Sequence, residues 1–255
     1  MVIATIAFLI AISLPSLRNS RQQAKAILCS SNIKQLTFGL LLYENQNQTL
    51  PYGFYNTPMG TPPPGGYSGY IQYDRAGWWW LNFIEGFYKK SDSKRTVVQC
   101  PSKRLNNPKL INNILCGNYG VNRSICKSSN DRQSKREEFI GTPLSSSDIP
   151  GPSETLLIVD SGYSLISWWH VTNVPPVKLS NKIIEDAAYV PGLKINQERK
   201  LWPGQEQDAI DGRHPNKTIN VGFVDGHVSR KKADDLFVEK ADDNYKNKSP
   251  LWAPK

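Results

Sequence analysis

The chain opens with an uninterrupted apolar segment, residues 1–17, which reads MVIATIAFLIAISLPSL. No charged side chain occurs before Arg18. A helix satisfies its backbone hydrogen bonds internally. A helix of this apolar segment is therefore more plausible inside a membrane than on a surface exposed to water. A helix that crosses a bilayer needs about 20 apolar residues, and this segment is slightly shorter. The pattern leaves three alternatives: a secretory signal peptide, a membrane helix that lacks its first turn, and a helix buried in a protein core.

The signal-peptide alternative is disfavoured. A signal peptide has a basic start, an apolar centre and small residues at its cleavage site. Ala11 and Ser13 have the required spacing, but no basic residue precedes the apolar segment and Pro15 follows closely. Proline just after the scissile bond disfavours cleavage.

From Arg18 to about Glu44, apolar positions recur every three or four residues, as they do along one face of a helix. This stripe consists of Ala26, Cys29, Ile33, Leu36, Leu40 and Tyr43. Because the periodicity continues directly from the apolar segment, we expect one long helix over residues 1–45, lipid-facing in its first half and amphipathic in its second. Residues 1–17 are then the membrane segment, and residues 46–255 form a globular domain.

The segment Leu50–Trp80 is rich in proline and glycine, which disfavour a regular helix or a central strand. We therefore predict a long ordered loop. Trp78, Trp79 and Trp80 begin a packed apolar segment that ends near Phe87. These aromatic rings either stack on sugars or cover the apolar stripe of the helix, and the second interpretation is favoured.

Two strand patterns follow. Glu154–Ser161 reads ETLLIVDS, a short branched apolar run that indicates a buried strand. Thr218–Val224 alternates apolar and polar positions, and Asp225-Gly226 is a preferred pair for a type I′ turn, so His227–Ser229 is expected as the partner strand. This C-terminal hairpin lies within residues 214–232. The fold class predicted is α+β, with the long N-terminal helix packed on an antiparallel β-sheet.

Residues 164–207 carry proline-glycine loop signals, and no regular element is assigned to them. Their single histidine, His170, is interpreted as a structural partner rather than a ligand.

Several short sequence boxes, spread over nearly the whole chain, occur in the order typical of one family. They are residues 2–17, Cys29–Leu36, Cys100–Ser102, Asn118–Asn122, Val159–Ser161 and His214–His227. In these boxes the chain resembles type IV pilin-like proteins, the prepilins and type II secretion pseudopilins. The resemblance is greatest to the group with a prepilin-type cleavage and methylation segment and a C-terminal H-x9-DG domain.

The resemblance implies a subunit of a type II secretion or type IV pilus-like filament, with other pilin-like subunits bound through the N-terminal helix. It implies a single-pass inner-membrane protein with its body in the periplasm, or a subunit assembled in an envelope or surface filament. No enzymatic activity is expected, since the sequence contains no recognised catalytic motif.

Two features depart from the family pattern. Family members carry a basic leader that ends in glycine and is followed by phenylalanine and glutamate, where a prepilin peptidase cuts and methylates. Here Met1 falls inside the apolar segment, and the basic residues follow that segment, an arrangement that by itself would retain the body in the cytoplasm. His214 and Asp225 also enclose ten residues instead of nine.

The sequence leaves two rival functions. The first is a membrane-anchored envelope or surface module that binds polysaccharide or another anionic polymer. The second is an envelope hydrolase. A catalytic base and the group that orients it must lie within about 3 Å or one water molecule. A strand that spans Thr218–Asp225 separates its ends by roughly 23 Å, so His214 and Asp225 are not expected to act together. No catalytic residue is assigned, and His214, Asp225, Gly226 and His227 are interpreted as structural.

The four cysteines, Cys29, Cys100, Cys116 and Cys126, contain no C-x-x-C pair, so no zinc site is expected. An envelope compartment permits disulfides. Of the three connectivities, Cys116 with Cys126 and Cys29 with Cys100 is preferred. The alternative is that some cysteines are small buried apolar groups.

The net charge of +9 is concentrated in residues 86–136, where twelve basic residues face only two acidic ones, Asp92 and Asp131. The basic residues are Lys89, Lys90, Lys94, Arg95, Lys103, Arg104, Lys109, Arg123, Lys127, Arg132, Lys135 and Arg136. Such a stretch can bind nucleic acid, anionic lipid or acidic polymers. Because no nucleic-acid-binding motif surrounds it, a solvated loop face is favoured and nucleic acid is not an expected partner.

Acidic residues gather in the last fifty residues, among them Asp208, Asp211 and Asp225. Calcium favours oxygen-rich loops, and some pseudopilins hold calcium in C-terminal loops. The spacing fits no EF-hand loop, and Arg230, Lys231 and Lys232 lie close enough to neutralise the acids. No cofactor is therefore expected, with calcium as the alternative.

Overall fold

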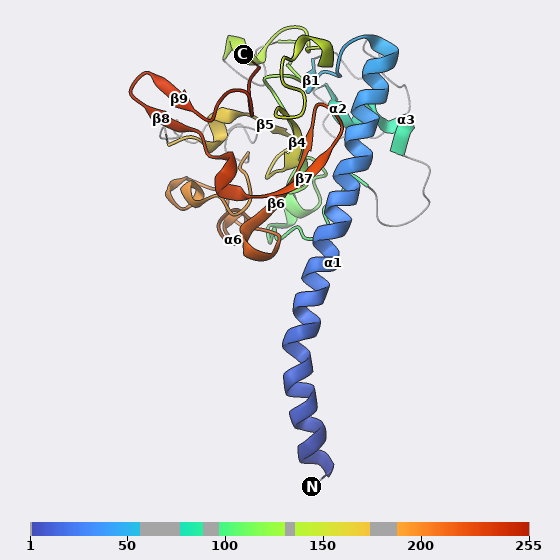
Figure 1. The fold of residues 1–255 in the computed structure, drawn as a ribbon, viewed down its shortest axis with the longest axis vertical. Coiled ribbons are helices and arrows are strands. Elements are labelled where there is room, and N and C mark those ends of the chain that lie inside the picture. The colour runs from blue at the N-terminus through green and yellow to red at the C-terminus, as the bar shows by residue number, and fades with distance from the viewer. Residues whose placement is uncertain (1, 57–76, 89–96, 131–135, 174–187, 255) are drawn as a thin grey trace.

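The computed structural model describes residues 2–56, 77–88, 97–130, 136–173 and 188–254. Its longest element is the helix α1 (Val2–Asn47), which projects from a globular body so that the N-terminus lies far from the rest of the chain (Figure 1). Pro15 lies inside α1. Proline removes one backbone hydrogen bond from a helix, but the helix continues through this position. The single long helix predicted from the sequence is confirmed.

In the first half of α1, the side chains that the structure describes are not buried by the body. Apolar side chains on it are about half exposed or more, for example Ile3, Phe8, Leu9 and Ile12. Its first side chain buried by the body belongs to Ala26. Among the described residues, no helix contains a segment both long enough and apolar enough to cross a bilayer.

The body is built on a five-stranded sheet with the strand order β5-β3-β4-β6-β7. The strands are β3 (Tyr119–Asn122), β4 (Leu156–Asp160), β5 (Leu165–Ile166), β6 (Thr218–Phe223) and β7 (Val228–Lys232). All neighbours are antiparallel except β3 and β5, which run parallel. The sheet is therefore mixed, whereas the sequence predicted an antiparallel one.

The second half of α1 packs on β4, β6 and β7 of this sheet (Figure 1). All six residues of the predicted apolar stripe are buried, with at most 5% of any of them exposed. The helix approaches β6 at Gly222, where a Cβ atom would lie 2.8 Å from Ile158 Cγ2 and within van der Waals overlap of Thr37 Oγ1. A residue without a side chain is needed at this position.

The tryptophan segment covers the C-terminal half of α1. It forms β2 (Trp78–Trp79), which pairs with β1 (Phe54–Tyr55), and the short helices α2 (Trp80–Phe83) and α3 (Glu85–Tyr88). Phe83 meets Tyr43 of α1 edge to face, with ring centroids 5.7 Å apart. Phe83 of this segment therefore covers part of the apolar stripe, while Trp79 packs against Phe54 and Tyr163 and Trp80 Nε1 donates to Ser164 O. Residues 57–76 of the predicted loop lie outside the described residues.

Short elements connect and close the body. They are α4 (Pro108–Ile111), α6 (Glu206–Asp211), the 3₁₀ helices η2 (Glu137–Phe139), η3 (Ser146–Asp148), η4 (Trp168–Val171), η5 (Lys194–Glu198), η6 (Pro215–Lys217) and η7 (Ala233–Leu236), and the hairpin of β8 (Glu239–Ala241) with β9 (Asn244–Lys246). The stretch 164–207, to which no element was assigned, contributes β5, η4, η5 and the start of α6; its residues 174–187 lie outside the described residues.

The predicted C-terminal hairpin is present as β6 and β7, but its turn is not of type I′. Only Gly226 has positive φ (90°), whereas a type I′ turn requires positive φ at Asp225 as well. Gly226 N–H donates to Phe223 O, and Phe223 N–H donates to His227 O, each at 3.0 Å. This is a three-residue loop in which glycine takes the left-handed bulge position. Lys34 of α1 ties the loop to the helix, because its Nζ donates to Gly226 O at 2.7 Å.

Candidate functional site

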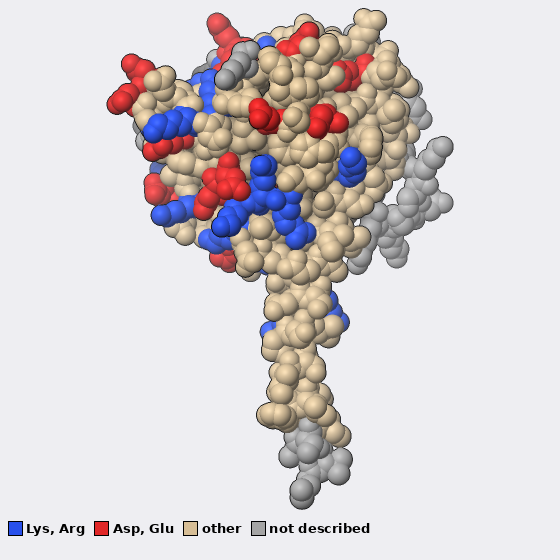
Figure 2. All heavy atoms as spheres, in the orientation of Figure 1, with Lys and Arg blue, Asp and Glu red and all other residues tan. Residues whose placement is uncertain are grey.

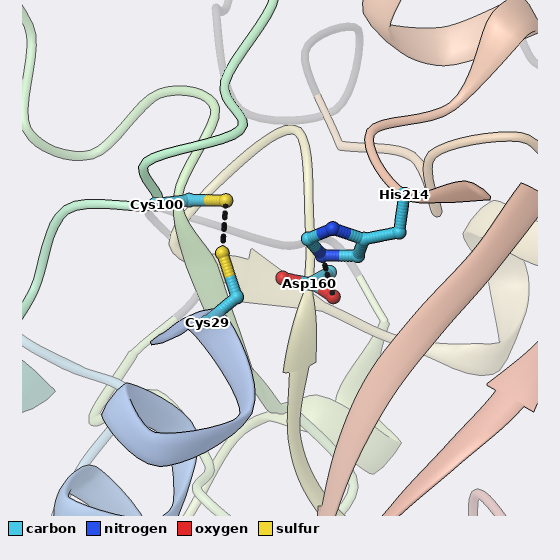
Figure 3. A group of neighbouring side chains, drawn as sticks. All are labelled: Cys29, Cys100, Asp160 and His214. Atoms are coloured by element: carbon cyan, nitrogen blue, oxygen red, sulfur yellow. Dashed lines mark hydrogen bonds and ion pairs between the residues drawn. The ribbon is translucent and has the colours of Figure 1, made fainter. Parts of the chain in front are cut away.

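Four side chains from four separate segments converge beneath α1 (Figure 3). Cys29 comes from α1, Cys100 from the loop after residue 97, Asp160 from the end of β4, and His214 from the segment before η6. Each offers one ligand atom, and these atoms all lie within 4.8 Å of one another. All four residues are at least 96% buried.

Two close pairs make up this cluster. The Sγ atoms of Cys29 and Cys100 are 2.8 Å apart, and both residues are free thiols. His214 Nε2 lies 3.1 Å from Asp160 Oδ2. The remaining buried polar atoms of the second pair, Asp160 Oδ1 and His214 Nδ1, have no hydrogen-bond partner.

Asn220 of β6 orients the carboxylate. Its backbone N–H and its side-chain Nδ2 donate to Asp160 Oδ2 at 2.7 Å and 3.2 Å. The same Nδ2 lies 3.4 Å from Ala26 O and 3.1 Å from His214 Nε2. Asn220 therefore links the sheet, the cluster and α1.

The electrostatics of the cluster are set by burial and by close opposite charges. Burial alone would raise the pKa of Asp160, but His214, Arg213 and the Asn220 N–H together hold it below its ordinary value. Burial likewise opposes a charged His214, yet the Asp160 carboxylate raises the pKa of its imidazole above the ordinary value. Burial, reinforced by the neighbouring Cys29 and by Asp160, raises the pKa of the Cys100 thiol well above its ordinary value. The Cys100 thiol is thus neutral beside an ion-paired carboxylate.

Arg213, next to His214, fixes this segment to the body. Its Nε and Nη2 bind the Asp208 carboxylate at 2.9 Å and 2.7 Å, and both residues are buried. Nη1 donates to Asn118 O at 2.7 Å and Nη2 to Ser161 O at 2.8 Å. The ion pair thus places His214 opposite the end of β4.

The residues considered for calcium do not meet. Asp208 is neutralised by Arg213 and also accepts hydrogen bonds from Tyr189 Oη and Arg104 N. Asp225 pairs with His227 at the hairpin loop, Nδ1 to Oδ1 at 2.6 Å. Asp211 is exposed at the end of α6. Within the described ranges, the cluster around Asp160 is the only group of three or more such side chains placed to hold one metal ion.

His214 and Asp225 have separate partners: Asp160 for His214 and His227 for Asp225. Gly226 forms the bulge of the loop described above. The expectation that His214 and Asp225 do not act as a pair agrees with these contacts.

The cysteines divide into one adjacent pair and two separate thiols. Cys29 and Cys100, preferred as disulfide partners, lie together as thiols. Cys116 is buried near Lys103 and Cys126 near Glu44, and both are free thiols. Burial raises the pKa of Cys116 to about 12. The preferred bond between Cys116 and Cys126 is therefore absent here.

The described part of the basic stretch does not form one solvated face. Arg123 is 1% exposed, and Lys103 Nζ donates to the Leu110 and Ile111 carbonyls. Arg136 stacks on the Trp169 ring at 3.6 Å. Lys89, Lys90, Lys94, Arg95, Arg132 and Lys135 lie outside the described residues. The visible face in Figure 2 shows basic side chains gathered on the lower part of the body, interspersed with acidic ones.

Sequence reasoning did not assign a role to Asp160, Asn220 or Arg213. A signal for Asp160 is present, because an acidic residue that directly continues a buried run such as LLIV needs a partner inside the protein. The absence of C-x-x-C argued against zinc, but here the donors come from four segments far apart in sequence. The sequence placed Cys29 on the buried face of the helix and paired it with Cys100, and the two sulfurs do lie together, but it gave no sign that Asp160 and His214 join them.

The cluster suits a bound ion or a bond between its two thiols rather than turnover of a substrate. A substrate would have to reach side chains that are at least 96% buried beneath α1. Two sulfurs, one nitrogen and one carboxylate oxygen form a donor set typical of zinc.

Comparison of the chain with family models, with curated proteins and with solved structures finds no match.

Proposed function

We propose that this chain is a pilin-like subunit of a type II secretion or type IV pilus-like filament in the bacterial envelope. The observation that carries the proposal is α1: its first half is apolar, exposed and free of packing against the body, while its second half is built into the core. A helix that presents this much apolar surface needs partners to cover it.

The outward face of α1 supports packing by other helices along the whole element. Beside the body, Ile27, Leu28, Phe38 and Leu42 are 46–62% exposed on the face that does not contact the sheet. Together with the projecting residues they extend the apolar surface past the body. We propose that the helices of neighbouring copies cover this surface, with the bodies arranged around them.

The lack of charged residues before Arg18 fits packing of the projecting helix among neighbouring helices. No acidic residue occurs before Glu44, and the first basic residues, Arg18, Arg21 and Lys25, follow the apolar segment. Figure 2 shows the projecting part almost without charge, with basic side chains only near the body. Before assembly, the proposal places the apolar segment in the inner membrane, with these basic residues at the level of the lipid headgroups.

The rival function, a polysaccharide-binding module, receives less support. Trp78, Trp79 and Trp80 are at most 7% exposed, so their rings are not available for stacking on sugars. Three of the described basic residues, Lys103, Arg123 and Arg136, are engaged within the body, as given above.

The proposal is tested by placing a charge on the projecting helix. In cells that produce the chain, Leu9→Lys is expected to remove it from filaments sheared off the cell surface, because a lysine in a helix-helix interface is costly to bury. Gln22→Lys is the matched control: it adds the same charge at an exposed polar position of α1 and is expected to leave the chain in the sheared fraction. Immunoblots of whole cells and sheared fractions provide the measurement. Equal recovery of wild type and Leu9→Lys would contradict the filament role.

A further inference from the structure

Cys29, Cys100, Asp160 and His214 form a set of donors with no opening to solvent. Their four ligand atoms lie within 4.8 Å of one another, and each residue is at most 4% exposed. In a tetrahedral zinc site, with zinc–sulfur bonds of about 2.3 Å and zinc–nitrogen or zinc–oxygen bonds of about 2.0–2.2 Å, neighbouring donors lie roughly 3.3–3.8 Å apart. The cluster is therefore of the size that one ion needs, once the two sulfurs separate by about 1 Å from their present distance.

Two atoms in the cluster lack partners. Asp160 Oδ1 and His214 Nδ1 are buried without a hydrogen bond, although buried polar atoms are almost always paired. A disulfide between Cys29 and Cys100 would leave both atoms as they are. A metal ion would engage the carboxylate and the imidazole as well as the two sulfurs, so it accounts for the whole cluster.

The surroundings already provide the outer contacts of a metal site. Ligands of structural zinc are oriented by hydrogen bonds from a second layer of residues. Asp160 Oδ2 is held by the backbone N–H and the side-chain amide of Asn220, which leaves Oδ1 free for an ion. Arg213, next to His214 in the chain, is paired with Asp208 and holds this segment in place.

We propose that Cys29, Cys100, Asp160 and His214 bind one Zn²⁺ ion as a closed structural site that fastens α1 to the sheet. Each thiol gives its proton to solvent when its sulfur binds the metal, so that two thiolates and one carboxylate surround the dication. All four coordination positions are filled by protein, which leaves none for a substrate. The ion joins α1, the Cys100 loop, β4 and the segment before η6. This inference does not depend on the filament role.

The first experiment measures the metal directly. The full chain is purified under reducing, anaerobic conditions and its zinc content is determined by mass spectrometry; we expect about one Zn²⁺ per chain. Metal-free protein titrated with Co²⁺ is expected to show the thiolate-to-cobalt absorption band and the visible bands of tetrahedral cobalt. Purified protein with neither zinc nor a cobalt–thiolate band, although folded by circular dichroism, would overturn the proposal.

Variants assign the ligands. Cys29→Ser and Asp160→Asn keep the size of each side chain and are expected to weaken Co²⁺ binding by at least about tenfold, as loss of site contacts does. Cys126→Ser is the matched control, because Cys126 is equally buried but outside the cluster, and it is expected to bind like wild type. If Cys29→Ser does not fold, the cobalt spectrum of the wild type still shows whether thiolates bind the metal. A Cys29–Cys100 disulfide in protein isolated from cells, with no metal bound before or after its reduction, would also refute the site.

Discussion

At the scale of single residues, His170 of η4 is kept neutral by its surroundings. Its buried ring accepts a hydrogen bond from Ser167 N at Nδ1, over 3.1 Å. Burial, reinforced by the charges of Arg199, Arg123 and Arg136, lowers the pKa of His170 well below 6.5. The structural role expected for this histidine agrees with its contacts.

This depressed pKa predicts a loss of stability in mild acid. Below pH 6.5 the unfolded chain binds a proton at His170 that the folded chain does not bind. The free energy of unfolding should therefore fall as the pH drops from about 6.5, by up to about 1.4 kcal/mol per pH unit from this residue. Urea unfolding followed between pH 7 and pH 5 measures the slope.

His170→Gln should flatten that slope, because the variant has no imidazole to titrate. His227→Gln is the control, since it removes a histidine whose side chain is 45% exposed at the hairpin loop. If His170→Gln and wild type lose stability in parallel over this range, His170 is not the residue responsible.

At the scale of elements, the contact between α1 and β6 depends on the missing side chain at Gly222. Its neighbours are Thr37 and Ile33 on the helix and Ile158 on β4. Interiors are packed closely enough that an added methyl group displaces its neighbours. The fit of helix on sheet is therefore tight at this point.

Gly222→Ala is expected to lower the free energy of unfolding by about 1–3 kcal/mol, the usual cost of overpacking. Thermal and urea unfolding measure the loss. Gly151→Ala is the matched control, because a Cβ there would meet its nearest atom at an ordinary 3.5 Å, and it should change stability little. Adding Thr37→Ala to Gly222→Ala should restore part of the loss, since it removes the closest atom. No difference between the two alanine variants would contradict the close approach.

Elements governed by local pattern could be predicted from the sequence, whereas those governed by distant pairing could not. The helical stripe, the strand at Leu156–Asp160 and the hairpin follow from spacing alone. The parallel pairing of β5 with β3 joins segments more than forty residues apart and has no local signal. Asp225-Gly226 suits both a type I′ turn and a type I turn with a glycine bulge, so the pair alone did not decide the turn type.

The cluster around Asp160 also could not be predicted from local pattern, because its residues are far apart in the sequence. The periodicity placed Cys29 on the buried face of α1, but its neighbours Cys100 and His214 lie 71 and 185 residues further along the chain. Only the folded sheet brings them together. Asp208 was considered for calcium because acidic residues gather near it, yet its charge belongs to a buried ion pair with Arg213.

At the scale of the whole molecule, the second half of α1 is part of the globular body, and the first half projects from it. Gln23 Oε1 accepts a hydrogen bond from Arg230 of β7 at 3.3 Å, and Ala26 is the first buried side chain of the helix. Removal of the entire helix would therefore take away part of the core as well as the projecting segment.

A truncation that removes residues 1–22 should leave the body folded, with cooperative thermal unfolding and without self-association in sedimentation. Removal of residues 1–45 should abolish cooperative unfolding, because the six stripe residues lose their place in the core. Circular dichroism and analytical ultracentrifugation provide the measurements. A folded, cooperative body after the longer deletion would show that α1 is not part of the core.

The two edge strands of the five-stranded sheet determine whether copies of the chain can associate by strand pairing. An open strand can recruit a strand from another molecule and so begin amyloid-like aggregation. One border here is β5, only two residues long; the other is β7, which carries Arg230, Lys231 and Lys232. A strand of two residues offers few backbone groups for pairing, and the positive charges on β7 would repel those on a second copy of β7. Both edges are therefore poor templates for strand addition. Concentrated chains should therefore resist edge-to-edge polymerisation through this sheet.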